Sequence, residues 1–402
     1  MIRRLYLPVI MLLALLVLAV PSRAEGLPTE LRSSARMSIL VASPSSNEVY
    51  TYYGHAGLRV LDESVGLDVT FNYGIFSFSD DFLYRFVAGR TDYIVMPQYT
   101  MDYMDEYLGR GSRVDELHLS LDSAERVYIW AYLLDNIRED KREYRYQFFR
   151  DNCATRPLDI LEQAVGGIVY PTDTLSRTWR QEINDLEASS PWLVLGTDLA
   201  LGTPTDTVMT MRDKAFSPRY LYDILSQAKR KDGGVLLSGI SRHEPYVQAK
   251  EEVKGLFTPG LVFSLLFGLV AGIYLLGLAY LGRKIAWGWD TLLFVPAGLG
   301  GLLLFYISVI SEHQFVSPNY NLWILHPLHL LTLLGLFPSL RLRTWLVCYH
   351  FVNFVAVCVF LLVAYFLPQH FNGALYLTAL SLAAVSAGRL LEYRRQTKNN
   401  GA

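Results

Sequence analysis

One cysteine stands in a setting that could activate its thiol. Cys153 lies in the segment 149–156, FRDNCATR, after a strand-like run and before a helical pattern that continues to Leu161. At a helix start, unsatisfied N–H groups and the helix dipole favour an anion and lower the pKa of a thiol. Arg150 and Arg156 could add to this effect. A small buried hydrophobic side chain is the other common role of a free cysteine, and this motif alone favours neither interpretation.

A thiolate nucleophile needs an imidazole to move protons, and three histidines share its part of the chain. His118 alternates with leucines like a surface residue of a strand, and His243 lies in a polar segment before the first apolar run. His55 stands between Gly54 and Ala56 at the start of a predicted strand, where small residues allow a substrate or another backbone to approach. His55 is therefore the predicted base, although a structural histidine at a sheet edge has the same local signature.

A third polar group would orient the imidazole. Residues 58–60 and 69–73 predict two strands of a hairpin, which would place Asn72 beside His55. Asp68, just before the second strand, is the alternative. An asparagine that joins two strands is an equally simple interpretation of Asn72.

The elements around these residues predict an α+β domain. Asp122 and Glu125 have the spacing of a capping box for a helix that ends near Ile137. Strands are also expected over 93–96, 114–119 and 144–149, and helices over 80–87, 102–108, 153–161 and 216–228.

Charge divides the chain into two parts. Among its 402 residues, 36 Lys and Arg nearly balance 38 Asp and Glu, which argues against a nucleic-acid partner. Sixty charged residues lie within 25–254, but only seven lie within 255–391. A polar domain is therefore followed by a strongly apolar one, and a wholly soluble or disordered protein is excluded.

The N-terminus has the pattern of a secretory signal. Arg3 and Arg4 precede the apolar run 5–20, and small residues up to Ala24 offer a cleavage site. We expect residues 1–24 to be a signal peptide and 25–254 to be exported; a retained anchor would leave the domain on the same side. In an oxidising compartment Cys153 would have no partner for a disulfide in its own domain.

The apolar part predicts five membrane spans. Loops that would face the cytoplasm carry Lys and Arg, whereas the opposite loops, 311–321 and 368–373, contain neither. The region 255–391 is expected to be an all-α bundle, with 392–402 as a cytoplasmic tail. The expected spans are 256–281, 291–310, 322–340 and the two halves of 344–388.

Three motifs together resemble the bacterial Lnb family: YGHAGLRV at 53–60, FNYG at 71–74 and DNCATR at 151–156. The order of histidine before cysteine resembles the circularly permuted branch of papain-like enzymes, which includes lecithin:retinol acyltransferase-like proteins. The resemblance implies a permuted papain-like domain followed by a multi-span domain. It also implies N-acylation of a lipoprotein's diacylglyceryl-cysteine, with a phospholipid as acyl donor, at the outer face of the bacterial inner membrane. Cys153 and His55 match the family's motifs as the catalytic pair, and Asn72 is the expected third residue.

Candidate substrate-binding residues lie within or next to these motifs, or in the loop before the third span. That loop crowds hydrogen-bonding groups at a membrane surface, as either an interfacial anchor or part of a site. No phosphate-binding glycine loop or dinucleotide fingerprint occurs, so no cofactor is expected. His326 and His329 are closely spaced, but Pro327 between them prevents the helical arrangement that a pair of metal ligands would need, so no metal is expected. The candidates are Tyr53, Arg150, Asn152, Arg156, Asn319 and Asn321.

Other functions stay open from the sequence. A papain-like cell-wall amidase or peptidase would use the same thiol but would not need five spans. A phospholipase would be the hydrolytic form of the leading hypothesis. A non-catalytic, membrane-tethered binding module would leave Cys153 buried and inert.

Overall fold

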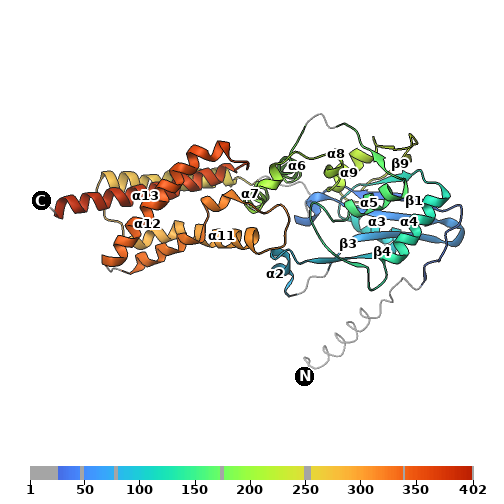
Figure 1. Ribbon diagram of the computed structural model, residues 1–402, viewed down its shortest axis with the longest axis horizontal. Coiled ribbons are helices and arrows are strands. Elements are labelled where there is room, and N and C mark those ends of the chain that lie inside the picture. Colours follow the sequence, from blue (N-terminus) through green and yellow to red (C-terminus); the bar gives the residue numbers. More distant parts are fainter. Residues whose placement is uncertain are drawn as a thin grey trace, which may run out of the picture.

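The computed structural model describes residues 26–45, 49–76, 80–172, 176–248, 255–337 and 340–400, so the expected signal peptide lies outside the described residues. A sheet-rich domain and a helical domain lie end to end along the long axis of the molecule (Figure 1). This arrangement agrees with the α+β exported domain and the helical membrane domain expected from the sequence.

The sheet is antiparallel throughout. Within the described residues seven strands form it in the order β6-β4-β3-β2-β1-β5-β9. The expected hairpin is confirmed as β2 and β3, in which Gly57 pairs with Asn72. The predicted strand over 144–149 is shorter than expected. The strands are β1 Arg36–Ala42, β2 His55–Asp62, β3 Leu67–Ile75, β4 Asp92–Tyr99, β5 Val114–Leu119, β6 Glu143–Arg145 and β9 Leu237–His243.

Helices cover both faces of this sheet because its strands bury apolar residues on each side. On one face, α4 (Ser123–Asn136) and α5 (Thr155–Ala164) belong to the main core, together with Leu58 and Phe71 of the central strands. On the other face, α3 (Thr100–Gly109) packs Tyr103 against β1 and β5. The capping box predicted for α4 is present.

Shorter elements complete the exported domain. The helix α2 (Phe82–Val87) follows β3, and a smaller two-stranded sheet pairs β7 (Ile168–Val169) with β8 (Lys229–Arg230). Four further helices follow: α6 Trp179–Leu186, α7 Pro191–Ala200, α8 Met211–Lys214 and α9 Pro218–Leu225. Of these, α7 contacts the first two helices of the membrane domain, whereas α9 packs in the main core against the sheet.

Among the described residues, four helical segments are long and apolar enough to span a membrane. They are Pro259–Tyr280, which begins as α10 (Pro259–Ala271) and continues as a π-helix; Trp287–Val309, which contains α11 (Thr291–Val309); Arg343–Phe366, within and just after α12 (Leu340–Val363); and Gly373–Asn399, within α13 (Gly373–Asn400). The helix α13 runs on through the expected boundary at 391, so most of the expected tail continues it.

The third expected span is not a long α-helix. Its described part forms two 3₁₀ segments, Tyr320–Trp323 and Pro327–Leu336, because Pro327 lacks the N–H that a continuous helix would need. The segment nevertheless follows α11 closely. A Cβ on Gly301 would lie 2.6 Å from the backbone of His326, so the small glycine allows the contact. The five expected spans thus correspond to four long helices and this 3₁₀ segment.

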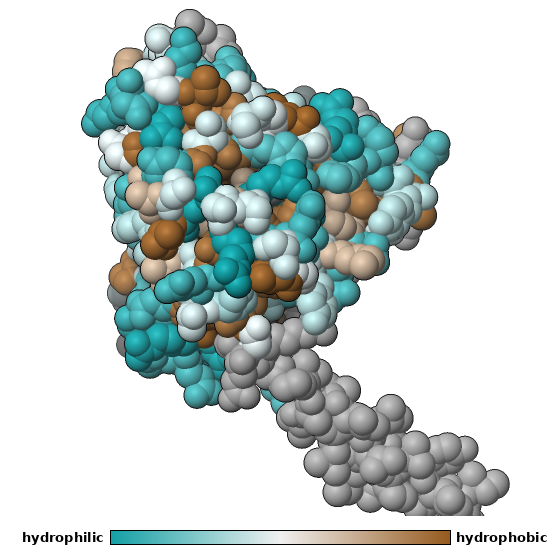
Figure 2. Space-filling model, turned by 90° about the vertical axis from the view of Figure 1, so that its right-hand side faces the viewer, coloured by the Kyte–Doolittle hydropathy of each residue, from teal (hydrophilic) through white to brown (hydrophobic). Residues whose placement is uncertain are grey.

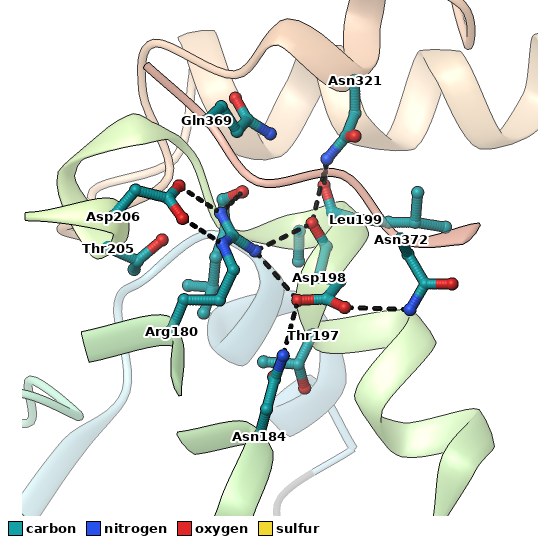
Figure 3. Close-up of polar contacts among 12 residues, drawn as sticks. Arg180, Asn184, Thr197, Asp198, Leu199, Thr205, Asp206, Asn321, Gln369 and Asn372 are labelled. Carbon is teal, nitrogen blue, oxygen red and sulfur yellow. Dashed lines mark hydrogen bonds and ion pairs between the residues drawn. The ribbon is translucent and has the colours of Figure 1, made fainter. Parts of the chain in front are cut away.

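A buried polar cluster joins the two domains (Figure 3). All three guanidinium nitrogens of Arg180 donate hydrogen bonds, to the carboxylates of Asp198 and Asp206 and to backbone carbonyls near the end of α7. The Asp198 carboxylate also accepts from Asn184 of α6, at 3.1 Å, and from Asn372 at the start of the last span, at 2.9 Å. A single carboxylate thereby connects the exported domain to a membrane loop.

Candidate active site

Asn152 shapes the turn that carries Cys153. Its side-chain oxygen accepts from the backbone N–H groups of Ala154 and Thr155, and its amide nitrogen donates to the carbonyls of Phe148 and Phe216. The helix α5 begins at Thr155, so Cys153 lies just before the first helical turn, not inside it as expected. The thiol sits in a rigid turn at the helix start.

His55 is the first residue of β2, and its imidazole is held between aromatic and glycine neighbours. The ring stacks on Tyr107, with ring centroids 5.3 Å apart and planes inclined by 10°. A Cβ on Gly74 would lie 2.2 Å from the His55 ring, so no larger residue fits there without movement. Gly74, part of the FNYG motif, is a positioning residue that the sequence did not single out.

Asn72 determines which imidazole nitrogen faces the thiol. Its Oδ1 lies 2.8 Å from His55 Nε2 and also accepts from the backbone N–H of Gly74, at 2.8 Å. Because a backbone N–H can only donate, the atom facing it must be the amide oxygen, and His55 Nε2 must carry the proton it shares with Asn72. Nδ1 of the imidazole is then left for Cys153. Asn72, not Asp68, occupies the orienting position, since Asp68 is paired with Arg59.

Electrostatics favour charge separation between the two groups. Burial raises the pKa of the Cys153 thiol, but the charge and hydrogen bond of His55, with the N–H groups of Ala56 and Cys153, lower it below its ordinary value overall. Burial lowers the pKa of His55, while Cys153, Asn72 and Glu106 raise it overall. Each group therefore favours the charged form of the other, as nucleophilic cysteine sites require.

Four tyrosines lie near the sulfur; three of them belong to the main core with α4 and α5, and Tyr103 comes from α3 on the other face. Tyr93, Tyr144 and Tyr146 each interact electrostatically with Cys153, as does Tyr103. The Tyr103 side chain is completely buried, yet within the described residues its hydroxyl has no hydrogen-bond partner. Such an orphaned donor is rare in a folded interior. From the sequence, residues 99–107 are expected to pack in the core. A sequence pattern cannot show that the hydroxyl of Tyr103 lacks a hydrogen-bond partner.

Tyr53 connects the loop before His55 to a buried acid, Glu187. Its hydroxyl donates to Glu187 at 2.6 Å, and Thr197 of α7 donates to the same carboxyl oxygen at 3.0 Å. Burial raises the pKa of Glu187 to about 7. The second oxygen of Glu187 has no partner among the described residues. Tyr53 therefore holds the loop before His55 against α7, and its hydroxyl is already engaged.

Three other binding candidates are occupied by structural contacts. The side-chain amide of Asn152 already forms the hydrogen bonds that shape the turn before α5. Arg156 pairs with Asp151 and covers the ring of Tyr144, with its guanidinium carbon 3.6 Å from the ring centroid. Arg150 pairs with Asp213 and lies over Trp179. The expectation that these arginines lower the pKa of the thiol is not supported, since His55 and backbone N–H groups do so.

The expected site residues of the membrane loop also serve packing. The loop does reach the segment before Cys153: Phe315 contacts Phe149, with ring centroids 4.7 Å apart. However, the side-chain amides of Asn319 and Asn321 donate to backbone carbonyls at the end of α7, and both side chains are buried. These contacts hold α7 in place, and substrate binding by the two asparagines stays a prediction.

Family models match both parts of the chain. The Lnb N-terminal periplasmic domain matches residues 29–183, which contain Cys153, His55 and Asn72, and the Lnb transmembrane domain matches residues 250–396. No curated protein and no solved structure matches the chain. Because the two models match in the order and at the positions of the two domains, the chain belongs to the Lnb family and is a membrane protein with a periplasmic domain.

Proposed function

We propose that this protein is a lipoprotein N-acyltransferase of the bacterial inner membrane. It moves an acyl chain from a phospholipid, through a thioester on Cys153, to the N-terminal amine of a diacylglyceryl-cysteine lipoprotein. The observation that carries the proposal is the contact of Cys153 with the His55 imidazole, which Asn72 orients, in a periplasmic domain attached to membrane spans. Membership of the Lnb family, which suggests a lipoprotein-processing membrane enzyme, supports it.

The first half-reaction forms the thioester. The Cys153 thiolate attacks the carbonyl carbon of the phospholipid ester, and a C–S bond forms as the carbonyl becomes an oxyanion. When the oxyanion collapses, the ester C–O bond breaks and the His55 imidazolium gives its proton to the departing lysophospholipid alkoxide. Cys153 then carries the acyl chain and His55 is neutral.

The second half-reaction transfers the acyl chain. The amine of the lipoprotein attacks the thioester carbon, neutral His55 accepts the proton that the amine loses, and the C–S bond breaks to restore the thiolate and imidazolium. An amide replaces a thioester, and no redox partner is needed. Water would compete with the amine, so a site that excludes water favours transfer over hydrolysis.

Two donors are available for the oxyanion that forms in both steps. The backbone N–H of Cys153 is one, and the unpartnered hydroxyl of Tyr103 is the other. A preoriented donor that gains its partner only as the oxyanion forms stabilises the transition state more than the ground state. This role accounts for a hydroxyl that is otherwise costly to bury.

The test uses the full chain in proteoliposomes with an isotopically labelled phospholipid and a diacylated lipopeptide. Mass spectrometry should find the labelled acyl chain on the peptide's N-terminus, an equal amount of lysophospholipid, and an acyl-Cys153 adduct when the acceptor is omitted. Free fatty acid without N-acylated peptide would indicate a phospholipase instead, and cleavage of a cell-wall peptide would indicate a peptidase.

A further inference from the structure

The short helix α2 exposes apolar side chains that its own domain leaves uncovered. Leu83 is 71% exposed, Tyr84 61% and Phe86 43%, and Arg85 is the only charged residue of the helix. On the end of the exported domain far from the membrane, apolar residues are instead scattered among hydrophilic ones (Figure 2). The exposed surface of α2 therefore needs a partner.

Contacts with the membrane domain determine where α2 lies. The carbonyl of Ala88, directly after the helix, accepts from the backbone N–H of Glu312 at 2.9 Å, and His313 contacts the carbonyl of Phe86 at 2.5 Å. Tyr84 forms a side-chain hydrogen bond with Tyr306 of α11. These partners lie at the periplasmic end of α11, and α2 is beside that end in Figure 1.

Gly89 makes this approach possible. It adopts φ +69°, and a Cβ on it would lie 2.5 Å from the backbone nitrogen of His313. Val309 is the last residue of α11 and Ile310 follows it. Their side chains are 61% and 54% exposed and face the lipid in a membrane. The exposed side chains of α2 are thus held at the level of the lipid surface.

Aromatic rings continue from α2 toward the thiol. Successive ring centroids lie 4.2–6.1 Å apart, and the last two rings interact electrostatically with Cys153. In order from the membrane side, this aromatic strip consists of Phe86, Phe82, Phe76, Tyr93 and Tyr146.

We infer that α2 inserts its apolar side chains into the outer leaflet of the membrane and that the aromatic strip guides the acyl chain of a membrane lipid to Cys153. This inference rests on the proposed function for the chemistry at the thiol. The occupant is lipid, because the surface is continuous with the lipid-facing end of α11. Arg85 pairs with Asp92 at 2.9 Å and Arg90 pairs with Glu312 at 2.8 Å, so the apolar surface and not charge carries the argument for lipid.

The decisive experiment compares two acyl donors on the full chain in proteoliposomes. Leu83→Glu should slow the acylation of Cys153 by vesicle phospholipid about 10-fold or more, because a charge would oppose insertion. Acylation by a soluble short-chain ester, p-nitrophenyl acetate, should change less than about 2-fold, because that donor does not need the membrane surface. Val127→Glu is the matched control: Val127 is 63% exposed on α4, away from the membrane domain, and should affect neither donor.

Equal rates of Leu83→Glu and the unmodified protein with vesicle phospholipid would overturn the inference. An unmodified protein whose Cys153 accepts no acyl chain from either donor would instead refute the proposed function. The membrane contact can be checked without catalysis by placing the photoreactive residue p-benzoylphenylalanine at position 83 or 127. Cross-links to phospholipid from 83 and not from 127 are expected, whereas cross-links from 83 to a second copy or another protein would contradict the inference.

The strip is tested separately. Phe76→Ala should reduce acylation by long-chain phospholipid more than acylation by p-nitrophenyl acetate, since a short chain does not extend along the rings. An equal effect on both donors would limit Phe76 to packing.

Discussion

Two buried polar clusters lie near the boundary between the domains, and they differ in how their hydrogen bonds are satisfied. In the domain junction, every nitrogen of the Arg180 guanidinium donates, and the Asp198 carboxylate accepts from three side chains. At the candidate active site, the hydroxyl of Tyr103 has no hydrogen-bond partner within the described residues. There, His55 lowers the pKa of Cys153, and Cys153 raises the pKa of His55.

The difference separates stability from reactivity. Buried groups whose bonds are formed, like those of Arg180 and Asp198, hold two elements in one arrangement and gain little from a ligand. Groups with an unused donor or a shifted pKa gain when a reacting molecule supplies the missing partner. We therefore expect changes at the junction to affect folding, and changes around Cys153 to affect rate.

The largest effect is expected from Cys153→Ser. An alcohol at this position is not ionised, so acyl transfer should fall on the order of 10⁴-fold or more while the unfolding temperature stays nearly constant. Mass spectrometry of the lipopeptide measures the transfer. Cys348→Ser, in the membrane domain, should retain full activity. Activity in Cys153→Ser would rule out a covalent thioester.

At the junction, Asp198→Ala should destabilise the protein by about 3–5 kcal/mol, because it leaves the buried Arg180 without one of its two carboxylates. Denaturant unfolding of the full chain in detergent measures the change. Asp185→Ala removes an exposed ion pair with Arg177 and should cost at most about 1 kcal/mol. Similar losses in both variants would show that the junction adds no special stability.

Glu187 should make stability depend on pH. Its pKa is about 7 in the folded protein and near 4.5 when unfolded, so the protein loses stability as the pH rises from about 4.5 through 7. Glu187→Gln removes that loss and should gain about 3 kcal/mol relative to the unmodified protein at pH 8, but little at pH 5. Unfolding midpoints at the two pH values test this, and a gain independent of pH would contradict it.

Tyr103→Phe should separate rate from stability most sharply. Loss of one oxyanion donor slows acylation about 100-fold, whereas removal of a hydroxyl without a partner should leave stability unchanged or slightly higher. Single-turnover acylation and thermal unfolding measure the two effects. A destabilised variant with a normal acylation rate would assign the hydroxyl a structural role.

The smallest effect is expected from Asn72→Ala, which should slow acylation about 10-fold, because the imidazole loses its orienting acceptor but keeps its chemistry. Asn72 also raises the pKa of His55, so in this variant the thiolate should form at higher pH. The pH profile of Cys153 alkylation by iodoacetamide measures that shift. Asn72→Asp retains an acceptor and should restore most of the rate; an unchanged profile in both variants would remove Asn72 from the site.

Much of the architecture followed from local patterns. Charge distribution separated the exported domain from the membrane domain, and the strand patterns around His55 and Asn72 predicted the hairpin that brings them together. These predictions succeeded because hairpin register and the need for about 20 apolar residues per span are local properties. The third expected span has the composition that the rule requires, but Pro327 interrupts its helix, so the segment forms 3₁₀ turns and not a long α-helix.

Contacts between distant segments were decided only by the tertiary structure. The sequence marked Asn319, Asn321, Arg150 and Arg156 as binding candidates by their chemistry, but packing uses their donors on α7 and on nearby acids. It did not mark Tyr103, whose significance is a missing bond. Whether a polar group is free to meet a substrate depends on which distant groups already occupy it, and no spacing along the chain records that.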